Sequence, residues 1–289
     1  MGKMSITPAP TYDGASMRPE RQDIAAPEFP GRLRWLNVTR KPAMSELTAA
    51  GPVLVHFFDF AQLNSVRALP YARAWHERYS DSGLTVIGVH SPRFPFTARR
   101  EALGPALEEL GIEHPIADDS AYHVWHDYGC QGWPSLFLWG QGGALRWYHF
   151  GEGEYVATEE AIQQEIREAE PLADLPAPLE PLRPSDVPGT MVAQPTAEVF
   201  PGGDASQPWR AGGADDAIEL EWAAAGAHAA VDGQGRLSAT IDGEERELEI
   251  TGPGLVDLLV GERHGNHRMR ITADSGVEIF AISFSAGPP

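Results

Sequence analysis

Two uninterrupted apolar segments, residues 52–58 (PVLVHFF) and 84–90 (LTVIGVH), constrain the fold of this chain more than any other feature. A strand that is apolar at every position is buried on both faces, which is typical of a parallel sheet covered by helices. Residues 64–79 lie between the two segments and carry an apolar helical stripe, interrupted by Pro70. The order strand, helix, strand therefore predicts an α/β unit with a parallel sheet.

The segments that follow complete this unit. Further helices are predicted at residues 99–110, 119–128 and 157–168, and strands at 136–139 and 145–150. The two strands are joined by Gly-Gln-Gly-Gly, which is a signal for an antiparallel hairpin. We expect a layered α/β fold that ends in this hairpin and a closing amphipathic helix.

Composition changes after the last of these helices, and the pattern of a second domain follows. Residues 171–195 alternate proline with apolar and acidic residues, so we expect an extended, solvated linker there. Beyond it the apolar period becomes two and Asp-Gly turn signals recur, which predicts an all-β sandwich. The predicted domains are a flexible arm at 1–27, an α/β domain at 28–170, the linker, and the sandwich at 196–289. The strand candidates of the sandwich are 219–222, 227–231, 237–241, 246–250, 254–259, 267–272 and 277–284.

Three segments of the α/β domain carry a resemblance to a known family. Residues 26–37 (APEFPGRLRWLN) precede the first buried strand, and residues 58–71 (FDFAQLNSVRALPY) align without a gap to the pattern W-T-Y-x-C-I-N-C-x-R-x-L-P-Y. Residues 128–135 (YGCQGWPS) are similar to the segment Y-G-x-x-x-W-P-x. The domain therefore resembles bacterial thioredoxin-like (redoxin) proteins, including the thioredoxin domains beside NHL repeats and those fused to membrane disulfide-relay proteins. This resemblance implies a thioredoxin fold, a cis-proline at Pro134, and a C-terminal sandwich similar to carbohydrate-binding modules.

The dithiol motif of that family is absent, because Gln62-Leu63-Asn64-Ser65 stands where the resemblance places two cysteines. Disulfide exchange needs a low-pKa thiolate that attacks and a second thiol that resolves the mixed disulfide. The Gln62 amide cannot attack, and the Ser65 hydroxyl ionises too weakly without a dedicated base. The resemblance also places His56 where thioredoxins have a buried acid. We therefore expect no ordinary thiol–disulfide oxidoreductase activity and no cofactor.

The groove that remains around this motif predicts a binding function without catalysis. Asn64 and Arg67 match family positions beside the two lost thiols at Gln62 and Ser65. The resemblance implies that Trp133-Pro134 forms the loop that presents backbone hydrogen bonds to a bound peptide or substrate. We therefore expect a protein or peptide partner that binds in the cis-proline groove.

Two alternatives stay open beside this interpretation. Cys130 is the single thiol of the chain, and it would serve a thiol-dependent redoxin or peroxidase if it were reactive. It would equally serve as a small buried hydrophobe, since free cysteines are usually buried. The second alternative is carbohydrate binding by the sandwich through Trp209, Trp222 and Phe200, although such aromatic residues more often fill a sandwich core.

Other chemistry-bearing patterns in the chain predict no site. Ser65 lacks the nucleophile-elbow pattern that a triad with His56 and Asp59 would need. Zinc requires three or four ligands, and pairs of histidines alone do not supply them, so we expect no metal site. Two such pairs have the spacing i, i+3: His123 with His126, and His264 with His267.

The net charge and the cysteine content indicate which classes of partner and which cellular compartment fit this chain. The chain has 41 acidic against 22 basic residues and a formal net charge of -19, which repels phosphate backbones and anionic membranes. One cysteine cannot form an internal disulfide, and this fits a reducing compartment. The N-terminal segment has no apolar signal-peptide core, and no stretch is long enough to span a membrane. We expect a soluble, cytoplasmic protein that binds neither nucleic acid nor membranes.

Overall fold

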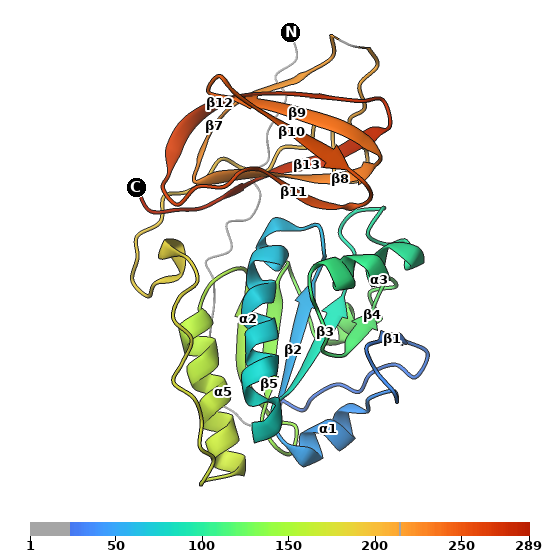
Figure 1. Cartoon of the computed structure of the whole chain (residues 1–289). Helices are drawn as coiled ribbons and strands as arrows, with labels where there is room; N and C mark the ends of the chain where they lie inside the picture. Colours follow the sequence, from blue (N-terminus) through green and yellow to red (C-terminus); the bar gives the residue numbers. More distant parts are fainter. Residues whose placement is uncertain (1–23, 214) are drawn as a thin grey trace, which may run out of the picture.

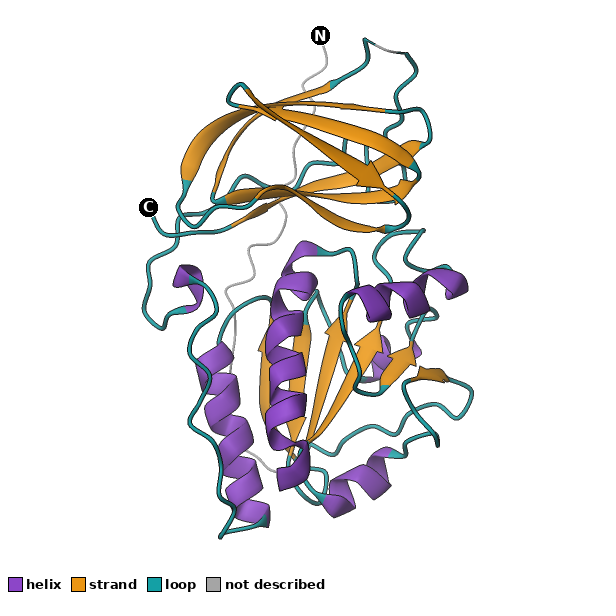
Figure 2. Ribbon diagram, viewed as in Figure 1, coloured by secondary structure: helices purple, strands orange, loops and turns teal. Residues whose placement is uncertain are grey.

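The computed structural model describes residues 24–213 and 215–289, and its N-terminal half is built on a six-stranded mixed sheet (Figures 1 and 2). The strand order is β1-β4-β3-β2-β5-β6; β2, β3 and β4 pair in parallel and the other neighbours antiparallel. The predicted α/β unit with a terminal hairpin is therefore confirmed. Of the predicted arm, residues 1–23 lie outside the described residues. The strands are β1 (Arg34–Leu36), β2 (Val53–Phe58), β3 (Thr85–His90), β4 (Ile116–Asp118), β5 (Ser135–Trp139) and β6 (Leu145–Phe150). The helices are α1 (Met44–Ala50), α2 (Leu63–Tyr79), η1 (Ser80–Ser82), α3 (Arg100–Glu109), α4 (His123–Asp127) and α5 (Tyr155–Ala169).

Strand β2 shows why the first apolar segment has no polar face. All six of its residues are buried, because helices cover both sides of the sheet. Val53 and Phe57 pack in the cluster that includes residues of α1 and α4. Leu54 points the other way and packs with Tyr71 and Trp75 of α2. The central strand is thus held from both faces, and the loop that follows it has a rigid base.

The C-terminal part is a sandwich of two antiparallel sheets, as predicted from the period-two pattern. One sheet has the order β10-β9-β12-β7 and the other the order β11-β8-β13. Alternate side chains of both sheets meet in one apolar cluster, which includes Trp222, Leu237 and Ile271. The strands are β7 (Ile218–Ala224), β8 (Gly226–Gly233), β9 (Gly235–Ile241), β10 (Glu244–Ile250), β11 (Gly254–Leu259), β12 (Gly265–Ala273) and β13 (Val277–Ser285).

The sandwich lies over the edge of the α/β sheet at which β2 and β3 end (Figure 1). A single apolar cluster contains residues of both parts, among them Phe96, Ala230 and Phe280. The ring centroids of Phe96 and Phe280 are 4.7 Å apart. At the margin of this contact, Arg99 forms an ion pair with Asp232 at 2.7 Å. The two parts therefore share buried apolar surface.

Residues 171–195, which we name the strap, lie along the α/β part on their way to the sandwich (Figure 1). Ala173, Leu175 and Leu179 pack against the apolar cluster that includes residues of α2 and α5. The N–H of Leu179 donates to Glu159 Oε2 at 3.0 Å. The expectation of a solvated linker is therefore wrong in this respect, because apolar residues between the prolines find partners on the helices. The strap contains one short helical turn, η2 (Pro184–Asp186).

The shared cluster generates a prediction about stability. Phe280→Ala should lower the free energy of unfolding by about 3 kcal/mol, because it removes a large buried ring and leaves a cavity between the two parts. Urea denaturation followed by tryptophan fluorescence measures this change. Val260→Ala is the matched control, since Val260 is 65% exposed. A change below about 1 kcal/mol for Phe280→Ala would contradict a shared core.

Candidate binding site at the start of helix α2

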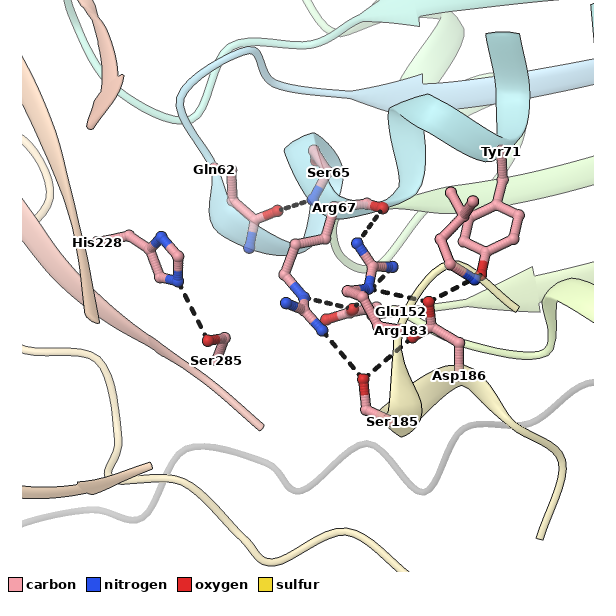
Figure 3. A network of polar contacts seen from close by, with 11 residues as sticks. Gln62, Ser65, Arg67, Tyr71, Glu152, Arg183, Ser185, Asp186, His228 and Ser285 are labelled. Carbon is pink, nitrogen blue, oxygen red and sulfur yellow. Dashed lines mark hydrogen bonds and ion pairs between the residues drawn. The ribbon is translucent and has the colours of Figure 1, made fainter. Parts of the chain in front are cut away.

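The two positions that the resemblance assigns to thiols form a helix cap. Gln62 is the N-cap residue of α2, and its Oε1 accepts the N–H of Ser65 at 2.7 Å (Figure 3). The Ser65 hydroxyl oxygen in turn accepts the N–H of Asp59 at 3.2 Å. Gln62 is 7% exposed and Ser65 is fully buried. Hydrogen bonds between side chain and backbone therefore occupy the place of the dithiol.

Asp59 ties this loop to the segment after β3. Its carboxylate is fully buried and accepts the N–H of Ala61 at 2.7 Å and the N–H of Arg93 at 2.6 Å. The hydroxyl of Thr97 also donates to it. The Ser65 hydroxyl bonds to the N–H of Asp59, and neither ring nitrogen of His56 has a partner among the described residues, so Ser65, His56 and Asp59 do not form a catalytic triad.

Arg67 connects helix α2 to the loop after β6 and to the strap. Its Nε pairs with Glu152 Oε1 at 2.6 Å, and its Nη2 donates to Ser185 Oγ at 3.3 Å (Figure 3). Arg183 of the strap also approaches Glu152 Oε1, at 3.6 Å, and donates to the backbone oxygen of Arg67. The resemblance indicated Arg67 as a binding residue. Its partners Glu152, Arg183 and Ser185 lie more than 80 residues further along the chain, and no local sequence pattern indicates that they contact it.

The strap closes the same network through Tyr71. The Tyr71 hydroxyl donates to Asp186 Oδ2 at 2.8 Å and accepts the N–H of Leu182 at 2.8 Å (Figure 3). Burial raises the pKa of this hydroxyl well above its ordinary value. Tyr71 therefore stays protonated and acts as a hydrogen-bond donor at every ordinary pH.

The peptide bond between Trp133 and Pro134 is cis. The Trp133 indole N–H donates to the backbone oxygen of Ser91 at 2.7 Å, and its ring lies 4.5 Å from that of Trp125. Pro134 is buried. The backbone oxygen of Pro134 accepts the N–H of Gly151 at 2.8 Å, so these partners of the loop all belong to the α/β part.

A pocket of about 630 Å³ lies between the start of α2, the end of the strap and the sandwich. Gln62, Asn64 and Arg67 line it from the α/β part, whereas Trp133 and Pro134 are not among its lining residues. Opposite them lie residues 192–198 and Ser283 with its neighbours. The predicted positions around the motif are thus divided: Gln62, Asn64 and Arg67 line this pocket, whereas Ser65, Trp133 and Pro134 do not.

An ion pair that no sequence pattern indicated lines one side of the pocket. Arg93 and Glu198 are paired across the two parts, and Ser283 Oγ donates to Glu198 Oε1 at 2.7 Å. These residues come from the loop after β3, the start of the sandwich and β13. Only the docked arrangement of the two parts brings them together, so no local pattern could have indicated them.

A second polar group lies on the sheet β11-β8-β13 of the sandwich. His228 Nε2 is 3.1 Å from Ser285 Oγ (Figure 3). His228 Nδ1 is 2.7 Å from Asp257 Oδ1. The bond from His228 lowers the pKa of the Asp257 carboxyl. The order of groups is that of a serine-hydrolase relay, but Ser285 is 4% exposed and lies on a strand rather than at a sharp turn. These hydrogen bonds therefore connect side chains of the three adjacent strands β11, β8 and β13.

Cys130 is buried and lies in the apolar cluster on the α1 and α4 side of the sheet. It is 8% exposed, and this burial raises the pKa of its thiol far above the ordinary value. A neutral buried thiol is a poor nucleophile. The geometry therefore gives no support to the alternative of a redoxin that uses Cys130.

The aromatic residues proposed as a sugar platform are not exposed together. Trp222 is 3% exposed and stacks against Phe284 with 5.1 Å between ring centroids. Trp209 packs against the sandwich core. The ring of Phe200 faces the guanidinium of Arg93, 5.8 Å away, at the contact between the two parts. The alternative of a stacking platform therefore receives no support, because all three rings pack against groups within the chain.

One histidine of each pair has a polar partner within the chain. His123 Nε2 lies 3.1 Å from Arg32 Nη2, and His267 Nδ1 lies 2.6 Å from Asp242 Oδ2. Across residues 24–213 and 215–289, no group of three histidine, cysteine, aspartate or glutamate side chains is arranged to hold a metal ion. Within the same residues, no helix is both long and apolar enough to cross a membrane.

Comparisons with known proteins relate both parts of the chain to one group. The family described as "Thioredoxin like C-terminal domain" matches residues 204–285, within the sandwich. Protein DipZ of Mycobacterium tuberculosis is 28% identical over 90% of this chain, and human NHL repeat-containing protein 2 is 34% identical over 46% of it. Both parts of the chain are similar to thioredoxin-like proteins. The predicted resemblance, including that to thioredoxin domains beside NHL repeats, is confirmed. The chain spans 42% of the length of DipZ and 18% of the human protein.

Solved structures align with the α/β part of the chain. A thiol-disulfide isomerase from Corynebacterium glutamicum aligns with 48% of this chain and 95% of its own, at 24% identity and a TM-score of 0.40.

The cap geometry predicts that a disulfide can be built back into the loop. The double variant Gln62→Cys with Ser65→Cys should form a disulfide under mild oxidation, because the Gln62 side chain already reaches the backbone of residue 65. Thiol titration of the denatured protein before and after oxidation measures this. Each single variant is a control that should keep its free thiol. A double variant that never oxidises would show that the loop is not built like a dithiol site.

Buried histidines give the fold a dependence on pH. His56 of β2 and His114 are almost fully buried, and none of their ring nitrogens has a hydrogen-bond partner among the described residues. The pKa of each imidazole is lowered to about 3, and burial is the largest cause in both. For His114, nearby His56, His76 and Arg73 contribute to the same shift. The neutral form is therefore the one that the folded protein accommodates.

The protein should lose stability as the pH falls from about 6.5 toward 3. The pKa of an unfolded histidine is about 6.5, so each of the two residues contributes its full stabilisation above that pH and loses about 1.4 kcal/mol per unit below it. Urea denaturation at a series of pH values measures the slope. His56→Leu should reduce this slope, whereas His126→Leu, at an exposed position, should leave it unchanged. Equal slopes in all three proteins would contradict the role of His56.

Proposed function

We propose that this protein binds a peptide segment of a protein partner in the pocket beside the start of α2, without thiol chemistry. One observation carries the proposal: Gln62 and Ser65, at the two thiol positions, are hydrogen-bonded cap residues, and Gln62 still lines an open pocket. A volume of about 630 Å³ lies within the range of ligand pockets and holds a few peptide residues.

The composition of the pocket walls supports a peptide rather than a purely apolar ligand. Asn64 and Gln194 offer amide groups, and exposed Val192 and Ala197 offer apolar surface beside them. Peptides present carbonyl and N–H groups at regular spacing between side chains, so they use both kinds of wall. The proposed site differs from the predicted cis-proline groove in its second half, where residues of the sandwich replace Trp133 and Pro134.

The two alternatives receive less support from the same residues. A peroxidase would need an accessible thiolate, and Cys130 is buried with a raised pKa. Carbohydrate sites stack sugars on exposed rings, and Trp222 lies in the sandwich core. A peptide ligand needs neither a thiolate nor an exposed ring.

A random heptapeptide library tests the proposal through affinity selection and mass spectrometry. The wild-type protein should retain a subset of peptides, and Ala197→Trp should weaken their binding by about tenfold or more, because a large ring fills the pocket. Ala121→Trp is the matched control, since Ala121 is exposed and does not line the pocket. Failure of the wild-type protein to retain any peptide, or equal binding by Ala197→Trp, would contradict the proposal.

A further inference from the structure

The floor of the pocket holds a hydrogen-bond donor that has no partner. The cap uses only Oε1 of Gln62, and Nε2 makes no hydrogen bond to any described residue. Figure 3 shows this nitrogen turned away from Ser65. Gln62 is 93% buried, given its 7% exposure, and it lines the pocket. The amide nitrogen is not one of the sealed interior atoms that lack a partner, so it is open to the pocket, where a ligand oxygen can accept its hydrogen bond.

The first turn of α2 adds two further donors beside this amide. The N–H groups of Leu63 and Asn64 have no acceptor among the described residues, as expected for the first residues of a helix. Helix α2 has 17 residues, and its first turn contains no acidic side chain that would neutralise the positive end of the helix dipole. Both residues line the pocket. The N-terminus of α2 is therefore an open site for a negatively charged group.

The charged side chains around the pocket are already matched with one another. Arg67 is paired with Glu152, and Arg93 is paired with Glu198. Asp59, behind the loop, accepts three hydrogen bonds from its own surroundings. The helix terminus and the Gln62 amide thus stay as the unmatched positive features of the pocket. The net charge of -19 slows the approach of anions over long distances but does not alter these short-range donors.

We infer that this corner of the pocket binds a carboxylate, and that the peptide enters with its C-terminal end. The inference rests on the proposed peptide function. A carboxylate has about four lone-pair positions and can accept from Gln62 Nε2 and from both backbone N–H groups, whereas a main-chain carbonyl accepts at most two hydrogen bonds. Only the chain end of a peptide supplies this group independently of its sequence.

The first experiment compares two forms of the same random heptapeptide library, one with free C-terminal carboxylates and one amidated. The free-acid library should be retained about 10- to 100-fold more strongly, which corresponds to charge-assisted hydrogen bonds to a carboxylate. Equal retention of both libraries would overturn the carboxylate site and leave the peptide function intact. Retention of neither library would overturn the peptide function and this inference with it.

The second experiment uses Gln62→Glu, which changes one donor into an acceptor. The glutamate oxygen can still accept the N–H of Ser65, and a negative charge at a helix start favours the helix, so the thermal midpoint should not fall. Binding of free-acid peptides should weaken about 10- to 100-fold, and it should weaken more than binding of amidated peptides does. Gln141→Glu, at an exposed hairpin position, is the control and should bind like the wild type. Undiminished binding of free-acid peptides by Gln62→Glu would overturn the inference.

Discussion

The apolar contact between the sandwich and the carboxyl edge of strands β2 and β3 is the interaction on which the site depends. Phe96 and Phe280 meet in it, and the ion pairs Arg99–Asp232 and Arg93–Glu198 lie at its margins. Without this contact the start of α2 would face solvent, and the pocket would have only one wall. Burial of the rings also lowers the polarity around nearby hydrogen bonds, which strengthens them.

Replacement of two thiols by glutamine and serine changes what the loop can do while keeping its shape. A dithiol loop must expose one sulfur to a partner disulfide, whereas Gln62 and Ser65 turn their oxygen atoms toward the backbone. The same helix terminus that would stabilise a thiolate is then free to stabilise a ligand. In the function proposed here, the loop serves recognition rather than thiol chemistry at these two positions.

The sequence was sufficient for those parts of the molecule that local patterns control. The fully apolar run of β2 and the period-two strands of the sandwich predicted both folds, because burial on one or two faces determines the periodicity of apolar residues. Gln62, Asn64 and Arg67 could be selected as site residues by their alignment with a known motif. Glu198 and Ser283 could not, since they reach the pocket only through docking of the two parts. The strap was misjudged for a related reason: proline spacing indicates an extended chain but not the surface on which it lies.

The strap has a consequence for the kinetics of any partner that competes with the sandwich. Tyr71, Arg67 and Glu159 hold it against the α/β part by hydrogen bonds, so only residues 187–192 lie between the last of these contacts and Ala193, whose N–H donates to the backbone oxygen of Gly287 beside the end of β13. A short tether gives the detached sandwich a very high effective concentration near its own docking surface. Rebinding within the molecule would then be faster than capture by a second protein at ordinary cellular concentrations. Ligands that enter the pocket while the two parts stay docked are therefore favoured over those that need the two parts to separate.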